Sequence, residues 1–255
     1  TQSADAAELA ANWQRLAEHF DTLFTTESSL DALKQTILQL AVMGKLVPQD
    51  PNDEPASELL KRIAKERARL EAEGTIKKSN PMPLVGEDEK PFALPMGWEW
   101  SRLGSIATTS TGKTPATSKA EYYGNKLSFI GPGQLTLAGE MLPPEKFLSE
   151  AGRSETTLAK AGDVLMVCIG GSIGKAAIAI AEVAFNQQIN CASPILVGGK
   201  YLYSAMCAPH FQKVVVAAAT GSATPIINRS NWDEIPISLP PLAEQHRIVA
   251  KVDEL

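Results

Sequence analysis

Hydrophobic positions in the first ninety residues recur at the three-and-four spacing of an α-helix. They form three stripes: Leu9, Trp13, Leu16, Phe20 and Leu23; then Leu30, Leu33, Ile37 and Leu40; then Leu59, Ile63 and Leu70. This spacing predicts three amphipathic helices, each with one apolar face. A serine before a stripe and a glycine after it are typical helix boundaries. These are Ser28 or Ser29 with Gly44 for the second helix, and Ser57 with Gly74 for the third.

The third predicted helix is highly charged outside its apolar stripe. Oppositely charged residues lie four positions apart at Glu58–Arg62, Arg62–Glu66 and Arg67–Glu71. Pairs at this spacing support a solvent-exposed helix surface. A narrow apolar seam with charged flanks is typical of coiled coils. We therefore expect an arm that packs against other long helices; the alternative is a small helical cap on the domain that follows.

The pattern changes after a linker at residues 77–95, which contains four prolines and several charges. Short β-like runs then alternate with glycine- and proline-rich turns: Trp98–Leu103, Leu127–Ile130, Val164–Ile169, Ala176–Ile180 and Ile195–Val197. Two short helices follow, Tyr201–Cys207 and one that Pro209 starts and that runs to Ala218. The fold class is therefore α+β. We expect three parts: a helical arm with its linker at 1–91, a globular domain with a mixed β-sheet at 92–235, and the start of a long helix at 236–255.

A last helix begins near Pro241, whose missing N–H suits a first turn. The positions that follow share one helix face: Leu242, Gln245, Ile248, Val252 and Leu255. Neither a glycine cap nor a proline stop appears by Leu255. We expect this to be the start of a long coiled-coil helix, and the chain to be part of something larger.

The same segment has a distinctive amino-acid sequence. Residues 239–255, LPPLAEQHRIVAKVDEL, closely resemble the segment that follows each target-recognition domain in the specificity subunit of type I restriction–modification enzymes. Further stretches match the family in order: LPMGWEW at 94–100 followed by Leu103-Gly104, TGKTP at 111–115, GSIGK at 171–175, NQQIN at 186–190 and TGSATP at 220–225. Each motif alone is weak, and the ordered set is specific.

The resemblance implies a DNA-binding protein that reads sequence and has no catalytic activity of its own. One target-recognition domain of this family reads one half of a bipartite target in double-stranded DNA. Modification subunits, which bind S-adenosylmethionine and methylate adenine, and restriction subunits, which use ATP and Mg²⁺ and cut DNA, are the implied partners. The cofactors thus belong to those partners and none to this chain. Since a full-length subunit has two such domains, the resemblance implies a fragment, or a half-subunit that self-associates through its helices.

Composition and charge limit this interpretation. Of the 255 residues, 44% are hydrophobic, and no apolar run approaches the roughly 20 residues that a membrane span needs. The net charge of −5 argues against nucleic acid at first sight. Residues 92–235 are less acidic, however, with 11 basic against 10 acidic residues, where residues 1–91 have 11 against 16. DNA binding therefore needs a local basic face or a partner protein.

The three cysteines have no metal-binding or redox spacing. Cys168, Cys191 and Cys207 sit among apolar neighbours and form no CxxC pair. We expect buried, reduced thiols, as in a cytoplasmic protein.

The glycine cluster at 170–174, GGSIG, permits an enzymatic alternative. It fits the G-x-S-x-G nucleophile elbow of a serine hydrolase, with Ser172 as nucleophile and Asp233 and His246 downstream in the required order. An elbow should lead into a helix, whereas KAAIAI at 175–180 alternates like a strand. A tight hairpin is the favoured interpretation. Asp88-Glu89-Lys90 resembles a nuclease motif, but we expect that its proline-rich linker cannot hold the carboxylates rigidly around a metal.

Candidate DNA contacts lie in four polar segments. Lys113 and Thr114, Ser172 and Lys175, and Arg229 offer charge and hydroxyl groups to phosphate oxygens. Gln187 and Gln188 offer amides that can pair with the base edges of adenine. Ordinary solvated turns are the alternative for the lysine loops. For the amides at 186–190, the alternative is hydrogen bonding to buried backbone groups.

Overall fold

The computed structural model describes residues 8, 11, 12, 14, 15, 18–20, 25–221 and 223–254. Leu9, Trp13, Leu16 and Leu23 of the first predicted helix therefore lie outside the described residues. From residue 25 onward the chain combines helices with a mixed set of strands, as the sequence predicts. None of the helices described is both long and apolar enough to cross a membrane.

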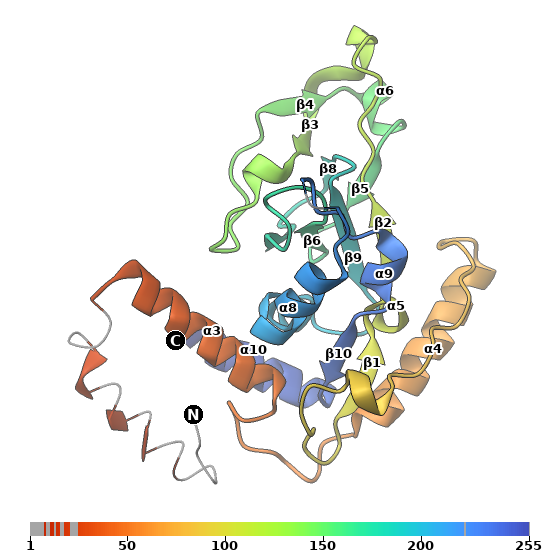
Figure 1. Cartoon of the computed structure of the whole chain (residues 1–255). Coiled ribbons are helices and arrows are strands. Elements are labelled where there is room, and N and C mark those ends of the chain that lie inside the picture. Colours follow the sequence, from red (N-terminus) through yellow and green to blue (C-terminus); the bar gives the residue numbers. More distant parts are fainter. Residues whose placement is uncertain are drawn as a thin grey trace.

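Three β-sheets form the middle of the molecule (Figure 1). In the first, β1 (Glu99–Arg102) pairs with β10 (Pro236–Leu239). The second has the order β2 (Ala107–Thr111), β9 (Ile189–Pro194), β6 (Val164–Val167) and β7 (Ala176–Ile178). The third has the order β4 (Lys146–Leu148), β3 (Tyr123–Ile130), β8 (Val183–Phe185) and β5 (Thr157–Ala159). Neighbours are antiparallel, except that β3 and β8 are parallel.

The second sheet is the central layer, and β6 explains why. All four residues of β6 are buried. Val164 and Met166 face a core shared with the helices, whereas Leu165 and Val167 face a core shared with the third sheet. Alternate side chains of a strand point to opposite faces, so a strand that is covered on both sides must be apolar throughout. The VLMV run meets this condition.

Helices cover one face of the central sheet and extend from the molecule. Their bounds are α3 Glu27–Val42, α4 Ala56–Ala72, α5 Leu103–Ile106, α6 Glu150–Arg153, α7 Gly199–Cys207, α8 Pro209–Ala218, α9 Arg229–Asp233 and α10 Leu242–Glu254. Short 3₁₀ turns occupy Glu87–Glu89, Ala120–Tyr122 and Pro132–Gln134. The prediction for α8 is confirmed at both ends, and α7 begins two residues before the predicted start.

One predicted strand is wrong. Ile195–Val197 forms no strand; the strand β9 precedes it and ends at Pro194. Leu196 has a φ of +55°, a left-handed conformation that interrupts extended backbone. The three apolar side chains at 195–197 belong instead to the turn that leads into α7.

Two predicted helix caps are also wrong. Thr26, not Ser28 or Ser29, caps α3, because its hydroxyl accepts the N–H of Ser29. At the start of α4, Pro55 and not the predicted Ser57 occupies the cap position, and no side chain there accepts a hydrogen bond. The predicted stop at Gly44 is confirmed: it has a φ of +66°, which glycine adopts without strain.

The predicted ion pairs along α4 form with other partners. The ion pairs that form are Lys61–Glu58, Arg62–Glu54, Arg69–Glu66 and Arg69–Glu73. Arg67 turns inward instead and donates to the carbonyl groups of Gly104, Ser105 and Ala107. The helix therefore directs one cation at the domain rather than at its own surface.

The apolar face of α4 is already occupied within the chain. Leu59 and Ile63 are buried in the same core as residues of the central sheet. For α4 this contradicts the expectation of an arm whose apolar face packs against other long helices, and it agrees with the alternative, a helix that caps the domain. The helix α3 lies against α7, α8 and α10 (Figure 1), so its buried end, from Ile37 onward, also belongs to this core.

One carboxylate of the linker, that of Glu89, is held firmly by an arginine. Glu89 accepts two hydrogen bonds from the guanidinium group of Arg102, at 2.7 and 2.6 Å. The Arg102 hydrogen bonds lower the pKa of Glu89 to about 2. Because Arg102 is buried and also donates to the carbonyl of Glu234, the pair ties the linker to the first sheet.

The start of α10 is fixed by two buried polar side chains. Glu244 accepts hydrogen bonds from Trp98 Nε1 at 2.9 Å and Gln49 Nε2 at 2.7 Å. Gln245 accepts from the N–H of Gly198 at 2.9 Å and donates to the carbonyl of Pro240 at 3.1 Å. The Glu-Gln pair of the family-like segment thus sets the direction in which α10 leaves the domain.

Candidate nucleic-acid interface

The polar motifs found in the sequence gather at one end of the central sheet. At that end β2 stops at Thr111, β9 begins at Ile189, β6 stops at Val167 and β7 begins at Ala176. The antiparallel register sets these ends side by side, pairing Thr111 with Asn190 and Met166 with both Asn190 and Ala176. We call the three loops there, residues 112–115, 168–175 and 186–188, the loop end.

A close backbone contact joins two of these loops. The N–H of Gly112 donates to the carbonyl of Ile189 at 3.0 Å, and that of Lys113 to Phe185 at 3.0 Å. A Cβ atom on residue 112 would lie 2.1 Å from the carbonyl oxygen of Asn186. Only glycine allows this approach. It brings Thr114 to Gln187, whose side chains are joined by a 2.7 Å hydrogen bond.

The amide cluster at 186–190 divides between structural and exposed side chains. Asn186 accepts the N–H of Gln188 at 3.0 Å and donates to its side-chain oxygen at 3.2 Å. Asn190 is buried and accepts from the Thr111 hydroxyl at 2.8 Å. Both asparagines are thus engaged within the fold, Asn186 with a backbone N–H as the structural alternative expects and Asn190 with a side-chain hydroxyl instead. Gln187 is exposed and Gln188 half-buried, so their amides lie at the surface of the loop end.

The glycine cluster is a hairpin, not a nucleophile elbow. The strands β6 and β7 pair antiparallel on either side of it, and no helix follows. Gly170 and Gly174 have φ angles of +94° and +90°, the conformation that the hairpin interpretation requires. Within the described residues no hydrogen bond joins the Ser172 hydroxyl to a histidine or a carboxylate. The serine hydrolase alternative therefore has no support.

The segment at 220–229 docks beside this hairpin. The N–H of Gly170 donates to Pro225 at 2.9 Å, and that of Ile227 donates to Cys168 at 3.0 Å. Arg229, however, is not on a loop as predicted. It begins α9 and donates from Nη1 to the carbonyl of Thr109 at 2.9 Å, part-way along β2 and away from the loop end.

The two predicted phosphate-binding lysines lie at opposite edges of the sheet. Lys113 follows β2 and Lys175 precedes β7, the two outer strands. Three strand spacings of about 4.8 Å separate these strands by roughly 14 Å, close to the width of a DNA major groove. The exposed amide of Gln187 and the half-buried amide of Gln188 lie between them, just before the start of β9. Lys113 is 63% exposed and lies 3.6 Å from Glu155, which offsets part of its charge.

Two threonines missing from the sequence prediction support the Lys113 loop. Thr156 donates from its hydroxyl to the carbonyl of Lys113 at 2.6 Å, and Thr157 donates to that of Thr111 at 2.9 Å. They lie more than 40 residues away in sequence, in and before β5, and their short Thr-Thr motif gives no signal of this role.

The thiols are not reactive groups of this site. Cys168 and Cys191 are buried as predicted, while Cys207 is half-buried, and all three are free. Burial raises the pKa of Cys168 to about 12 and that of Cys207 to about 11, and it also raises that of Cys191. Such thiols stay protonated near neutral pH.

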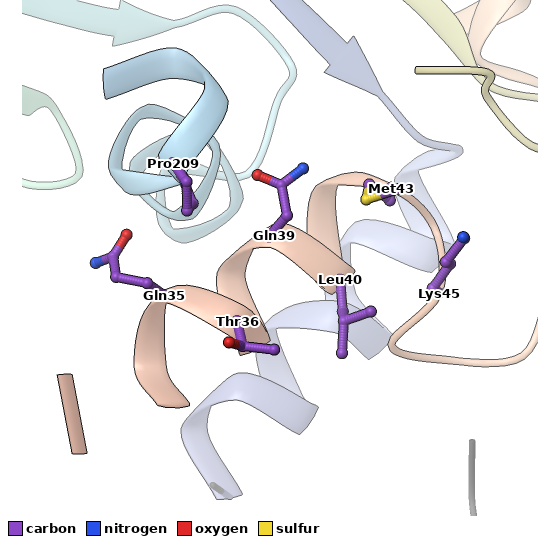
Figure 2. Close-up of a pocket in the computed structure, with 7 residues that line it drawn as sticks. All are labelled: Gln35, Thr36, Gln39, Leu40, Met43, Lys45 and Pro209. Atoms are coloured by element: carbon purple, nitrogen blue, oxygen red, sulfur yellow. The ribbon is translucent and has the colours of Figure 1, made fainter. Parts of the chain in front are cut away.

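A hollow of about 290 Å³ between α3 and the start of α8 is a weaker candidate site (Figure 2). Its lining is Gln35, Thr36, Gln39, Leu40, Met43, Lys45 and Pro209. Lys45 is the only ionisable group among these seven residues. The mixed lining offers no concentration of charge, so this hollow explains none of the predicted contacts.

Comparison with known proteins identifies the family. Residues 95–255, more than half of the chain, match the family described as type I restriction modification DNA specificity domain. The chain belongs to this family. It is similar to the type I restriction enzyme EcoEI specificity subunit of Escherichia coli, with 39% identity over 271 residues, covering 100% of this chain and 45% of that protein. The EcoAI specificity subunit of Escherichia coli is 74% identical over 106 residues, which cover 42% of this chain and 18% of that protein.

Solved structures agree on the fold. The HsdS subunit from Thermoanaerobacter tengcongensis has a TM-score of 0.51 and 23% identity, over 78% of this chain and 48% of that one. A chain from a study of complex assembly and conformational transition of the type I R-M system has a TM-score of 0.51, 24% identity and the same coverage. This specificity-domain chain therefore spans less than half the length of these relatives.

Proposed function

We propose that this chain is a DNA-recognition module of a type I specificity subunit and reads one half of a bipartite target. The observation that carries the proposal is the loop end, where three segments that are distant in the sequence meet, with the amides of Gln187 and Gln188 between two lysines. Amides suit base edges, and lysines suit phosphates. Membership of the specificity-domain family supports the same function.

The module acts through partners and supplies recognition rather than chemistry. Modification subunits hold S-adenosylmethionine and methylate adenine, and restriction subunits use ATP and Mg²⁺ to cut DNA. The similarity to specificity subunits of restriction enzymes supports this division. We place the protein in the cytoplasm, which its free thiols suit. Association with a second module through α3 and α10 is part of the proposal.

The place of each residue at the loop end indicates which part of the DNA it contacts. Gln187 and Gln188 face base edges, while Lys113, Thr114, Ser172 and Lys175 contact phosphates on both sides. Arg229 acts differently from the rest, because it lies at the start of α9 and its Nη1 holds the carbonyl of Thr109 in β2. Its guanidinium charge faces phosphates outside the loop end.

The test begins with the methylated sites that the intact restriction–modification system leaves in its own genome. Sequencing them defines the target. The specificity subunit, assembled with its modification subunits, is then bound to this duplex and to a scrambled duplex at several salt concentrations. We expect at least 10³-fold preference for the target. Equal affinity for both duplexes contradicts the proposal. Labelling of Ser172 by a covalent serine-hydrolase probe would restore the enzymatic alternative.

A further inference from the structure

The outer edge of β2 borders an open groove of about 950 Å³, which we call the edge groove. Its walls are α4, the linker at 76–82, β2 and α9. Its charged lining residues are Arg67, Lys77, Lys78, Arg229 and Asp233. With Asp233 ionised, these groups sum to +3 in a chain whose net charge is −5. A cleft with one sign of charge concentrates ions of the other sign.

The uncharged lining is rich in hydroxyl groups. They come from Ser79 of the linker, residues 108–111 of β2, Thr157 and Ser230. Three of these hydroxyls already donate within the chain: Ser79 to Glu71, Thr111 to Asn190 and Thr157 to the carbonyl of Thr111. The described lining includes no aromatic ring. Cations together with hydroxyl donors are the groups that contact phosphate and sugar in protein–DNA complexes. The lining therefore suits a polyanion better than an apolar ligand.

The pairing of β2 shows which backbone groups face the groove. On the side of β9, the N–H of Gly112 donates to Ile189 and the N–H of Ile195 donates to Ile106. Hydrogen-bonded positions alternate along an antiparallel strand, so the even-numbered residues of β2 are bonded to β9. The odd-numbered residues direct their N–H and C=O groups outward, to the edge groove.

All three outward carbonyl groups of β2 already accept a hydrogen bond from a side chain. The donors are Arg67 to Ala107 at 2.9 Å, Arg229 to Thr109 at 2.9 Å and Thr157 to Thr111 at 2.9 Å. A peptide that added to this edge as a strand would need these carbonyls as acceptors. With the acceptors occupied and the N–H groups of Thr109 and Thr111 directed outward, the edge offers donors. It disfavours strand addition and favours an anion.

We propose that the edge groove binds the phosphate backbone of DNA next to the bases that the loop end reads, with Lys77 and Lys78 as its charged contacts. This proposal rests on the DNA recognition proposed above. The five residues of β2 span about 17 Å at 3.4 Å each, and one strand of duplex DNA presents about five phosphates over that length. The groove reaches Thr111, where the loop end starts, so one backbone can pass from one region to the other.

Lys77 and Lys78 are the free charges of the groove. Both are exposed, and neither forms an ion pair or a side-chain hydrogen bond with a described residue. Arg67 and Arg229, in contrast, are engaged with the carbonyls of β2. The lysines therefore move to a phosphate without breaking an interaction, and their replacement leaves β2 intact.

The experiment compares three double variants of the specificity subunit assembled with its modification subunits. Lys77→Ala/Lys78→Ala removes the proposed contacts, and Lys77→Arg/Lys78→Arg keeps their charge. Lys61→Ala/Lys65→Ala is the matched control, since these lysines are exposed on α4 and do not line the groove. Binding to target and scrambled duplexes is measured by fluorescence anisotropy at several salt concentrations, and assembly by size-exclusion chromatography.

We expect Lys77→Ala/Lys78→Ala to make the decline of log affinity with log salt concentration less steep by about two units. Binding to both duplexes should weaken by the same factor. The arginine variant and the control keep the wild-type slope. A wild-type slope in the alanine variant overturns the proposal, and loss of modification-subunit assembly with that slope unchanged assigns the groove to an acidic protein surface instead. If the wild type itself fails to prefer the target, the proposed recognition fails; if the wild type prefers it, the edge-groove result stands by itself.

Discussion

The loop end and the edge groove meet at Thr111, yet different parts of the sequence build them. The loop end joins short motifs, each visible in the sequence, and its polar surface consists mainly of amides and hydroxyls. The edge groove draws its cations from α4, the linker and α9, and none of them lies in a recognisable motif. The charge also differs, since Lys113 at the loop end lies beside Glu155, whereas Lys77 and Lys78 have no acidic partner among the described residues.

This difference separates two tasks of DNA binding. Base edges supply sequence information but little net charge, while phosphates supply affinity that does not depend on sequence. A region of exposed amides suits the first task, and a cationic groove suits the second. An acidic chain can thus bind DNA if its few free cations are collected along one strand edge. Each prediction below perturbs one region and leaves the other intact.

The largest expected effect comes from Gly112→Ala at the loop end. The added Cβ would lie 2.1 Å from the carbonyl oxygen of Asn186, so the two loops must separate. We expect the free energy of unfolding to fall by about 1–3 kcal/mol, as in other overpacked sites. Several base contacts, each worth about 1–3 kcal/mol, should be lost together. Urea denaturation and binding to the target duplex measure the two effects.

Gly133→Ala is the matched control for this substitution. A Cβ on residue 133 meets nothing within 4 Å, so stability and binding should both stay at wild-type levels. A Gly112→Ala variant with wild-type target preference would show that the contact between the loops is irrelevant to recognition. The salt slope should remain, because the edge groove is untouched.

Gln187→Ala should produce the next largest effect. Its exposed amide accepts the Thr114 hydroxyl at 2.7 Å through its oxygen, which leaves the amide NH₂ group to donate to a base edge. We expect a loss of about 1–3 kcal/mol on the target duplex and no loss on the scrambled duplex. Gln35→Ala, an exposed glutamine on α3, is the control. Equal losses on both duplexes would instead mean that Gln187 only positions the loop.

The sequence predicted the loop end better than the edge groove for a physical reason. Glycines and prolines mark tight turns locally, so GSIGK and TGKTP were recognisable as loops before their neighbours were known. The strand ends that bring them together depend on the register of β2, β9 and β6, which a short strand of three to six residues does not reveal. The edge groove combines residues that lie still further apart in the sequence, from Arg67 to Arg229.

Several elements show the same limit on a smaller scale. The start of α8 was predicted because Pro209 favours the first turn of a helix, and the end at Ala218 was predicted as well. Six strands were not predicted: β4, β5 and β8, whose three residues are too few to show alternation, and β2, β9 and β10, which mix polar residues or proline with apolar ones. The stripe of Leu59 and Ile63 was recognised, but a helical stripe does not say whether its partner is another helix or the chain's own core. Here the partner is the core.

A smaller effect is expected from the single lysines of the loop end. Lys175→Ala should reduce the salt slope by about one unit and weaken both duplexes equally. Lys113→Ala should do less, because Glu155 already offsets its charge at 3.6 Å. Glu155→Gln therefore should strengthen binding slightly. Measurements at several salt concentrations rank the three variants, and an effect of Lys113→Ala larger than that of Lys175→Ala would contradict the offset.

The smallest expected effect is that of Asp233→Asn, which removes the acid from the edge groove. Burial raises the pKa of Asp233, and hydrogen bonding to Thr109 and the charges of Arg229 and Arg67 only partly oppose it. A carboxyl whose folded-state pKa is raised adds stability below its unfolded pKa, near 3.8, and that stability is lost as the pH rises through the folded-state pKa. The wild type should therefore lose unfolding free energy over this acidic window, and Asp233→Asn should lack that loss.

At neutral pH the variant should bind both duplexes about two- to fivefold more tightly, the range of a single solvent-accessible charge interaction. Urea denaturation from pH 3.5 to 7 and anisotropy at pH 7 test both expectations, with Asp31→Asn, an exposed aspartate of α3 outside the groove lining, as control. Weaker DNA binding by Asp233→Asn would show that this carboxylate organises the arginines of the groove rather than repelling phosphate.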